Sequence, residues 1–394
     1  MTQENTPNHP TGEAGSSGSA QPAYGQAYGS GYGQGAYQPT SPSFQPAQPS
    51  AWQGQPGFTA ARPAAENSAG PQAAQATAYS PAQRALLNVR TEVGKAVVGQ
   101  SAAVTGLLIG LLANGHVLLE GVPGVAKTLL VRALAASLRL EMKRVQFTPD
   151  LMPGDVTGSL IYDAQAGRFD FRPGPVFTNI LLADEINRTP PKTQASLLEA
   201  MEERQVTVDG QPWPLPSPFL VVATQNPVEY EGTYPLPEAQ LDRFLLKLEL
   251  PLPTREEEIE VLARHARGFD PTDLEAAGLR AVTDADELAS ARQQVARVQV
   301  DTPVLGYIAD VCRATRQAPS VSLGVSPRGE TALMRTSRAY AWLSGRDFVT
   351  PDDVKSLAIP TLNHRIQVRP EAQMDGTTAS AIIANVLATV AVPR

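Results

Sequence analysis

The spacing of apolar residues divides the chain beyond residue 80 into two parts. In the first part, short continuous apolar runs of the kind found in buried strands alternate with stretches of helical spacing. The predicted strands are residues 116–120, 142–147, 179–184, 219–224 and 244–250. The predicted helices of this part are residues 81–97, 102–113, 128–138 and 191–204. Strands and helices therefore alternate up to about residue 252.

Two short hairpins are also predicted in the first part. Residues 158–177 hold two strand-like segments separated by a loop that contains Gly167. Residues 206–214 turn at Asp209 and Gly210, a pair that favours a tight hairpin turn.

Beyond Pro253 the spacing predicts helices only. Thr254 and Glu257 form a capping box at the first of them, and Thr350 followed by Pro351 marks another clear helix start. The predicted helices are residues 254–267, 284–297, 302–316, 327–343 and 351–361, and the apolar run 379–392 is also interpreted as a helix. The second part is thus predicted to be all-helical.

Residues 1–80 differ in composition from the rest of the chain. Gly, Pro, Gln, Ser and Ala dominate, and no apolar period is present. Such a segment cannot bury enough apolar surface to offset its ordering entropy, so disorder is predicted. Aromatic residues are spaced along it, at Tyr24, Tyr28, Tyr32, Tyr37, Phe44, Trp52 and Phe58. They are compatible with a self-associating tail or with a plain solvated tether.

Composition and charge argue against several classes of protein. A net charge of -7 and an isoelectric point near 5.3 disfavour general affinity for nucleic acid or anionic membranes. The single cysteine, Cys312, excludes an internal disulfide framework and fits a reducing cytoplasm. The four histidines are scattered, without the spacing of a metal cage. With no signal-peptide pattern and no apolar run long enough for a bilayer, we expect a cytoplasmic protein without membrane insertion.

The segment between the first strand and the helix 128–138 has the pattern of a phosphate-binding loop. It reads Gly121, Val122, Pro123, Gly124, Val125, Ala126, Lys127 and Thr128. Only Ala126 departs from the pattern, at a position where a third glycine is usual. Backbone N–H groups at the helix start would face the phosphates, Lys127 would reach the outer ones, and Thr128 would bind Mg²⁺. A glycine-containing turn with a surface lysine is the plainer alternative, but the flanking strand and helix favour nucleotide binding.

Two other predicted strands end in polar side chains. The run 179–184 leads to Asp184, which would hold Mg²⁺, and to Glu185, which would orient and deprotonate the attacking water. Asn226 follows the strand 219–224 and is a candidate for holding that water or sensing the γ-phosphate. Ligands bind at the carboxyl edge of such sheets, where these side chains would meet. Taken alone, an acidic strand end is a common structural feature, and Asn-Pro indicates only a turn.

Two arginines downstream are less specific. Arg243 directly precedes the strand 244–250, and nothing in its position distinguishes it from an ordinary surface arginine. Arg328 lies in the first turn of the helix that Ser326 and Pro327 begin. A cation there opposes the helix dipole, so a nearby anion would explain it.

The order of these motifs resembles that of the AAA+ ATPases, and their amino-acid sequences resemble those of the MoxR family. The matching segments are Gly-Val-Pro-Gly-Val-Ala-Lys-Thr at 121–128, Leu-Leu-Ala-Asp-Glu-Ile-Asn-Arg at 181–188, Ala-Thr-Gln-Asn-Pro at 223–227 and Leu-Pro-Glu-Ala-Gln-Leu-Asp-Arg-Phe at 236–244. The similarity begins near Thr91 and includes Ala126, which is typical of the family. It implies an α/β fold, a doubly wound αβα sandwich with a parallel sheet over 81–252. An all-helical lid over 253–394 would follow, and the tail 1–80 stays unexplained.

The resemblance also implies roles for single residues. In addition to the phosphate loop, the family's Walker B residues correspond to Asp184 and Glu185, and its sensor 1 corresponds to Asn226. Arg328 corresponds to sensor 2, and Arg243 to the arginine finger that reaches a neighbour's γ-phosphate. Val98, Gly99 and Gln100 match the segment that lies near adenine. An arginine used by a neighbour requires a head-to-tail contact, and such contacts close into rings, hexamers in this family. Arg188 is the next candidate for the finger. The two hairpins are similar to the insertions of the branch that includes chelatases and MoxR proteins.

The resemblance thus implies an ATPase that uses ATP and Mg²⁺ to remodel or mature client proteins. Such proteins commonly act with a partner that carries a von Willebrand factor A domain, sometimes in metal insertion. Two alternatives remain open: the motor subunit of a magnesium or cobalt chelatase, and a nucleotide-dependent scaffold with negligible turnover. DNA unwinding is disfavoured by the acidic balance and by the lack of a basic groove interleaved with aromatic residues.

Overall fold

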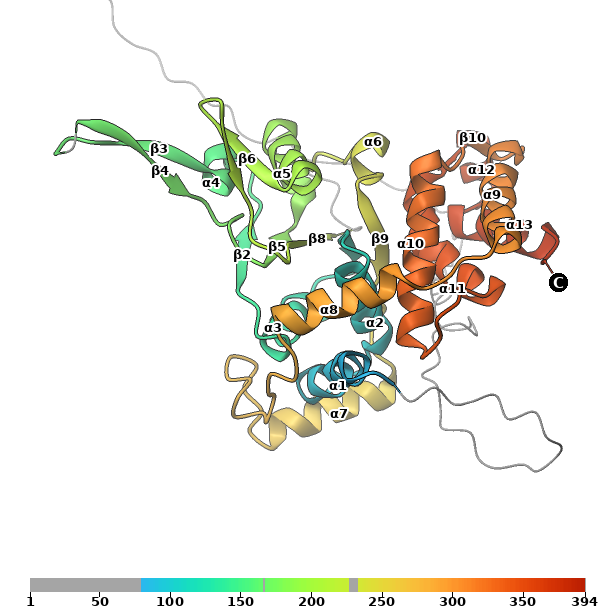
Figure 1. Cartoon of the computed structure of the whole chain (residues 1–394), viewed down its shortest axis with the longest axis horizontal. Helices are drawn as coiled ribbons and strands as arrows, with labels where there is room; N and C mark the ends of the chain where they lie inside the picture. The colour runs from blue at the N-terminus through green and yellow to red at the C-terminus, as the bar shows by residue number, and fades with distance from the viewer. Residues whose placement is uncertain (1–78, 166, 227–232, 394) are drawn as a thin grey trace, which may run out of the picture. The chain divides into compact units, whose positions relative to one another are not determined.

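The computed structural model describes residues 79–165, 167–226 and 233–393. The predictions for residues 1–78 lie outside this part of the chain. Five strands form one parallel sheet in the order β2-β5-β8-β1-β9 (Figure 1). Their bounds are β1 (His116–Glu120), β2 (Met142–Gln146), β5 (Ile180–Asp184), β8 (Leu220–Gln225) and β9 (Phe244–Glu249). All five predicted strands are confirmed. Because they are parallel, their carboxyl ends lie at the same edge of the sheet.

Helices cover both faces of this sheet. Val117 and Leu119 of β1 belong to an apolar cluster with α1 (Pro81–Ala96), α2 (Ser101–Leu112) and α3 (Lys127–Ser137). Leu118, between them, belongs to a second cluster with α5 (Pro191–Glu203). Because successive strand residues point to opposite faces, continuous apolar strands must be covered on both sides. The predicted αβα sandwich is confirmed.

Helices also dominate the part beyond Pro253, which confirms a helical lid. They are α7 (Arg255–Ala266), α8 (Ala285–Ala296), α9 (Thr302–Gln317), α10 (Pro327–Leu343), α11 (Pro351–Leu362), α12 (Pro370–Met374) and α13 (Ala379–Thr389). The capping box of Thr254 and Glu257 is present. Leu288 and Leu333 of the lid share the apolar cluster of α1 to α3. Among the described helices, none has the length and apolar character to cross a membrane.

The prediction of helices only beyond Pro253 is wrong in one place. Strands β10 (Val321–Leu323) and β11 (Gln367–Val368) form an antiparallel pair. Strands this short show no period of their own, and the paired residues Leu323 and Gln367 lie 44 positions apart, so local spacing does not reveal them. The short helices α4 (Pro153–Thr157), α6 (Glu238–Leu241) and α12 were also not predicted, because four or five residues are too few to show a helical period.

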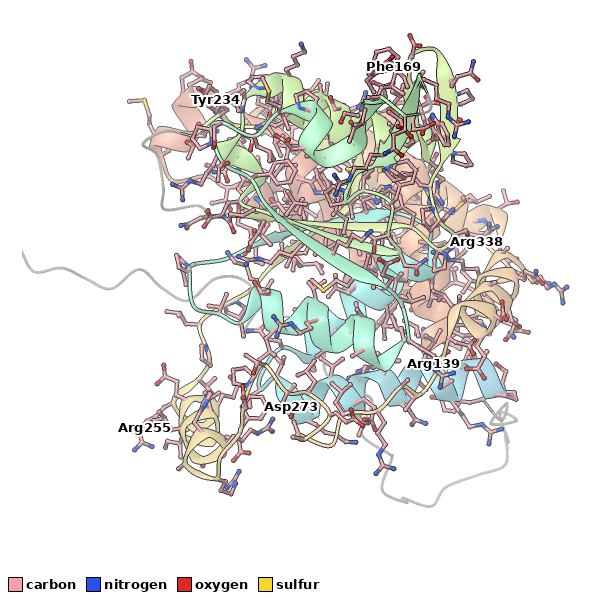
Figure 2. The ribbon with its side chains drawn as sticks, turned by 90° about the vertical axis from the view of Figure 1, so that its left-hand side faces the viewer. Arg139, Phe169, Tyr234, Arg255, Asp273 and Arg338 are labelled. Carbon is pink, nitrogen blue, oxygen red and sulfur yellow. The ribbon has the colours of Figure 1, made fainter. Side chains whose placement is uncertain are left out.

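Both predicted hairpins are present. They consist of β3 (Gly158–Asp163) with β4 (Arg168–Pro173) and of β6 (Gln205–Val208) with β7 (Gln211–Pro214). Phe171 and Trp213 stack between the hairpins with ring centroids 4.6 Å apart. Phe169 projects from the first hairpin with 65% of its surface exposed (Figure 2). Both hairpins lie on the same side of the sheet as α5 (Figure 1).

Candidate nucleotide site

The phosphate loop connects β1 to α3, as predicted. Gly124 and Ala126 both adopt positive φ, of 90° and 60°. Glycine adopts this conformation freely, whereas a residue with a Cβ is strained there by about 1–2 kcal/mol. Ala126 therefore keeps the geometry of the glycine that the general pattern expects, at some cost in stability. Lys127 is the first residue of α3, and its Nζ donates a hydrogen bond to the carbonyl of Gly121 at 2.7 Å.

The ends of β5 and β8 lie beside this loop because β8 is the neighbour of both β5 and β1. Asp184, at the end of β5, is buried. Its Oδ1 accepts a hydrogen bond from the Thr224 hydroxyl at 2.6 Å, and its Oδ2 accepts two from the Arg144 guanidinium of β2 at 3.0 and 2.7 Å. Thr224 and Arg144 were not among the predicted site residues. Since each lies on a strand adjacent to β5, only the strand order identifies them.

Glu185 adopts a left-handed backbone conformation, with φ of 57°. Strained backbone of this kind is often found at functional sites. Its N–H donates to the Thr224 hydroxyl at 2.8 Å, and its carboxylate accepts from Gln146 at 2.6 Å and from Arg188 at 3.1 Å. Arg188, the alternative finger, thus contacts the predicted general base of its own chain.

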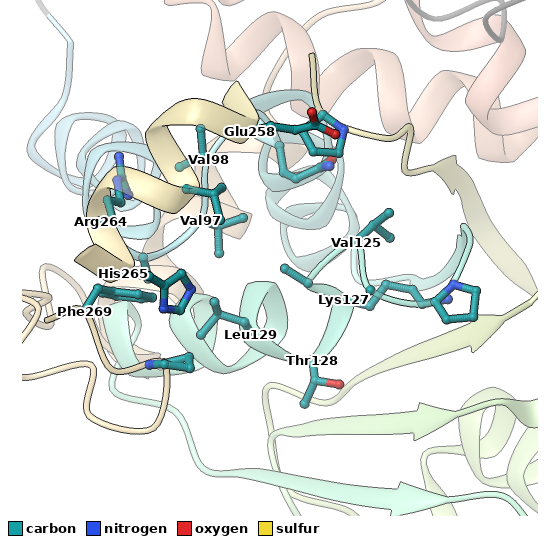
Figure 3. A pocket seen from close by; sticks show the side chains of 18 of the residues that line it. Val97, Val98, Val125, Lys127, Thr128, Leu129, Glu258, Arg264, His265 and Phe269 are labelled. Carbon is teal, nitrogen blue, oxygen red and sulfur yellow. The ribbon is translucent and has the colours of Figure 1, made fainter. Parts of the chain in front are cut away.

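One cavity of about 790 Å³, which we call the nucleotide cavity after its expected ligand, brings most of the predicted residues together (Figure 3). The predicted residues on its wall are Val98, Gln100, Pro123, Gly124, Val125, Ala126, Lys127, Thr128, Asp184, Glu185 and Asn226. Gly99, Gly121 and Val122 belong to the same segments but do not line it. The volume lies in the range of ligand sites, roughly 300–1,000 Å³. The loop and the two strand ends therefore form one pocket.

The cavity has two chemically different ends. Lys127 and Thr128 lie at one end, while Val97, His265 and Phe269 lie toward the other (Figure 3). The other lining residues that were not predicted are mostly apolar, namely Ala96, Leu129, Pro253, Val261, Leu262 and Pro271, beside the charged Glu258 and Arg264. Such an end suits a flat base, and the first end suits phosphates. The wall from α7 and the loop after it was not predicted, because its apolar residues follow ordinary helical spacing.

The residues at the phosphate end fit a magnesium ion. They offer one hydroxyl, from Thr128, and one buried carboxylate, from Asp184. Magnesium in nucleotide sites commonly takes one or two protein ligands and completes its octahedron with phosphates and water. In the described part of the chain, no cluster of three or more histidine, cysteine or acidic side chains could hold a metal ion. This donor set fits an ion bound together with the nucleotide.

Arg243 and Arg328 line a different cavity, of about 330 Å³, which we call the arginine cavity. Its cationic and acidic wall residues are Arg204, Arg243, Arg328, Arg335, Arg365, Glu202 and Asp242. Glu202 forms ion pairs with both predicted arginines, at 3.1 Å to Arg243 and 3.4 Å to Arg328. The structure thus places the two predicted arginines together and away from the nucleotide cavity.

Buried contacts hold the arginine cavity in shape. The Arg365 side chain is 3% exposed and is paired with Asp242, whose other oxygen accepts from Ser326 at 3.3 Å. Burial lowers the pKa of Arg365 to about 10, so it stays charged at neutral pH. Arg335 donates to the carbonyls of Ala113 and Asn114, at the end of α2. Cations are favourable at a helix C-terminus.

His116, the first residue of β1, also lines the arginine cavity. Its Nδ1 accepts from Val221 N–H at 2.9 Å, and its Nε2 lies 3.0 Å from the Met201 carbonyl, to which it donates in the tautomer that these contacts require. Burial, together with Arg204 and Arg335, lowers the pKa of His116 to about 4. The imidazole is therefore neutral at physiological pH and serves as a structural link between β1, β8 and α5.

Known proteins resemble the chain over both parts. Residues 116–246 match the model of the ATPase family associated with various cellular activities, and residues 313–386 match the AAA lid domain. YeaC of Bacillus subtilis is 50% identical, covering 80% of this chain and 98% of its own length. The chaperone MoxR1 of Mycobacterium tuberculosis is 41% identical, covering 86% and 89%. A crystal structure from Cytophaga hutchinsonii is 41% identical with a TM-score of 0.73, covering 79% and 96%.

Proposed function

This chain belongs to the MoxR family of AAA+ ATPases, and from that premise we propose that it hydrolyses ATP to ADP and phosphate to remodel or mature client protein complexes. The observation that carries the proposal is the single cavity that collects Lys127, Thr128, Asp184, Glu185 and Asn226. These residues come from three segments of the sequence and supply the groups that phosphoryl transfer to water needs. ATPase activity and a chaperone-like role are general in this family; the client process is our proposal.

Each side chain has a defined task in the proposed reaction. Backbone N–H groups at the start of α3 and Lys127 bind the phosphates. Thr128 and Asp184 would hold Mg²⁺, which would supply positive charge beside the phosphates. Glu185 takes the proton of the attacking water, and Asn226 orients that water. Arg144, which donates to Asp184 Oδ2, would hold this carboxylate in place beside the ion.

Arg243 and Arg328 complete the site from a neighbouring subunit. Both line a cavity other than the one that holds Asp184 and Glu185, which supports their use by another subunit. Proteins of the MoxR family generally form oligomeric rings. A head-to-tail contact would bring the arginine cavity of one subunit to the γ-phosphate of the next. We propose a hexamer with Arg243 as the finger and Arg328 as sensor 2.

The proposal extends to partners and location. A protein with a von Willebrand factor A domain would deliver the client, in some cases for metal insertion. The exposed Phe169 and Tyr162 of the first hairpin offer a contact surface for such proteins. The net charge of -7 argues against a nucleic-acid client. We expect the protein to act in the cytoplasm.

Magnesium-dependent phosphate release by the full chain tests the reaction. Glu185→Gln should bind ATP but release phosphate roughly 10²-fold or more slowly, because the amide cannot accept the proton. If Glu185→Gln turns over normally, the general base is another group. If the natural chain binds ATP without releasing phosphate, the scaffold alternative replaces the ATPase. Specific binding of the 158–177 hairpin to a chelatase-type partner would favour the chelatase alternative.

A further inference from the structure

A single carboxylate lies between the two arginines of the arginine cavity. Glu202 Oε2 lies 3.1 Å from Arg243 Nε, and Glu202 Oε1 lies 3.4 Å from Arg328 Nη2. The three side chains come from the last turn of α5, the residue before β9 and the first turn of α10. Each carboxylate oxygen contacts a different guanidinium. A phosphoryl group can occupy the same arrangement, since its oxygens also accept from several arginines.

Helix dipoles do not explain these positions. Glu202 lies in the last turn of α5, where a negative charge is unfavourable, and Arg328 lies in the first turn of α10, where a positive charge is unfavourable. The side chains are also accessible, at 40% for Glu202, 31% for Arg243 and 46% for Arg328. Accessible ion pairs are weak and exchange partners readily. The contact is therefore suited to replacement and contributes little to the stability of the fold.

We infer that Glu202 is a placeholder for the γ-phosphate of the neighbouring subunit. It keeps Arg243 and Arg328 together while no phosphate is present, and it leaves when the neighbour's nucleotide enters the arginine cavity. The inference rests on the proposed function, because the phosphate belongs to ATP bound by another subunit. Glu202 is a positioning residue here, since it acts through the arginines.

Charge explains why the phosphate replaces the carboxylate. A triphosphate carries more negative charge and more acceptor oxygens than one carboxylate, so it binds two guanidiniums more strongly. Glu202 is then repelled by the phosphate. Arg204 and Arg335 line the same cavity and leave cationic surface for the displaced carboxylate. Glu202 thereby sets the subunit concentration at which ATP-bound chains assemble.

Removal of this charge should lower that concentration. Glu202→Gln keeps the size of the side chain but weakens its hold on both arginines, so the competing phosphate binds more easily. We expect the half-point of assembly to fall about threefold to tenfold, the combined effect of two exposed ion pairs. The turnover number at saturating subunit concentration should stay within about twofold, because both arginines remain. A purely structural role would instead lower the turnover number or the stability.

The test is assembly of the full chain with Mg²⁺ and a non-hydrolysable ATP analogue, followed by sedimentation over a range of subunit concentrations. Glu203→Gln is the matched control, because it removes the same charge one residue further along and outside the cavity. Glu202→Asp is a second variant, since its shorter side chain cannot bridge both arginines. Thermal unfolding verifies that each variant is folded.

The outcomes separate this inference from the proposed function. A lower half-point for Glu202→Gln and Glu202→Asp, with Glu203→Gln unchanged, supports the placeholder. The shift should also shrink when Arg243→Ala is added. An unchanged or higher half-point for Glu202→Gln, in a natural chain that does assemble, overturns the placeholder and leaves the ATPase ring intact. A natural chain that never assembles with the nucleotide overturns both.

Discussion

The nucleotide cavity and the arginine cavity lie at opposite ends of the same elements, yet they are built by different means. Strand β1 begins with His116 at the arginine cavity and ends at Glu120, just before the phosphate loop. Helix α5 begins shortly after Glu185, which lines the nucleotide cavity, and carries Glu202, which lines the arginine cavity, in its last turn. A subunit therefore connects the proposed site for its own nucleotide with the proposed site for its neighbour's through two rigid elements.

Backbone geometry positions the nucleotide cavity. The loop, the first turn of α3 and the ends of two adjacent strands place its chemical groups, and Ala126 and Glu185 adopt left-handed conformations to do so. Side-chain pairs between distant segments position the arginine cavity instead. Asp242 pairs with Arg365 from 123 residues away and accepts from Ser326 at the start of α10. Short sequence motifs can encode the first kind of site, whereas the second kind is recognised only once the chain is folded.

The largest effect should come from Arg243→Ala. A finger that stabilises charge in the transition state contributes roughly 10³-fold to the rate, or about 4 kcal/mol. If the arginine cavity serves a neighbour, mixing Arg243→Ala with Glu185→Gln, which is also impaired, should restore activity. Random rings would contain intact interfaces at about a quarter of the positions. Phosphate release by the mixture is the measurement, and mixtures that stay inactive would move the finger to another residue, with Arg188 tested first.

The contrast between the two cavities explains which parts of the fold and of the candidate site could be predicted from the sequence. Buried strands and the phosphate loop were predictable because each has a local signal, a continuous apolar run or a glycine pattern. Arg144 and Thr224 were not, since they reach Asp184 from neighbouring strands. The grouping of Arg243 with Glu202 was equally invisible, because nothing in local spacing pairs the start of β9 with the end of α5.

The second effect concerns stability. Asp242→Asn leaves the Arg365 guanidinium, which is 3% exposed, without its counter-charge. Loss of one partner from a buried pair destabilises by 3 kcal/mol or more, and the partial exposure of Asp242 favours the lower end, about 3 kcal/mol. Asp352→Asn is the control, since this side chain is 89% exposed and should change stability by less than about 0.5 kcal/mol. Chemical denaturation measures both, and equal small effects would show that the ion pair does not organise the arginine cavity.

The third effect depends on pH and also concerns the arginine cavity. The folded chain lowers the pKa of His116 from 6.5 to about 4, so between these values the unfolded chain binds the extra proton. Stability from this group is complete above pH 6.5 and is lost as the pH falls toward 4, by about 2 kcal/mol at pH 5. Burial and Arg365 also lower the pKa of His364, which adds to the loss. His116→Gln keeps a donor and an acceptor, so its unfolding free energy should fall less between pH 7 and 5; an identical fall would assign the loss to other groups.

The smallest effect tests the backbone of the nucleotide cavity. Ala126→Gly should relieve the strain at φ of 60°, and the extra freedom of glycine in the unfolded chain offsets part of the gain. The net result should be a stabilisation of about 0.5–1 kcal/mol in chemical denaturation. Ala136→Gly, at an exposed helical position of the same α3, should destabilise by about 1 kcal/mol. Opposite signs for one chemical change would show that strain is stored in the phosphate loop itself. Destabilisation by both substitutions would mean that the methyl group of Ala126 contributes more than its strain.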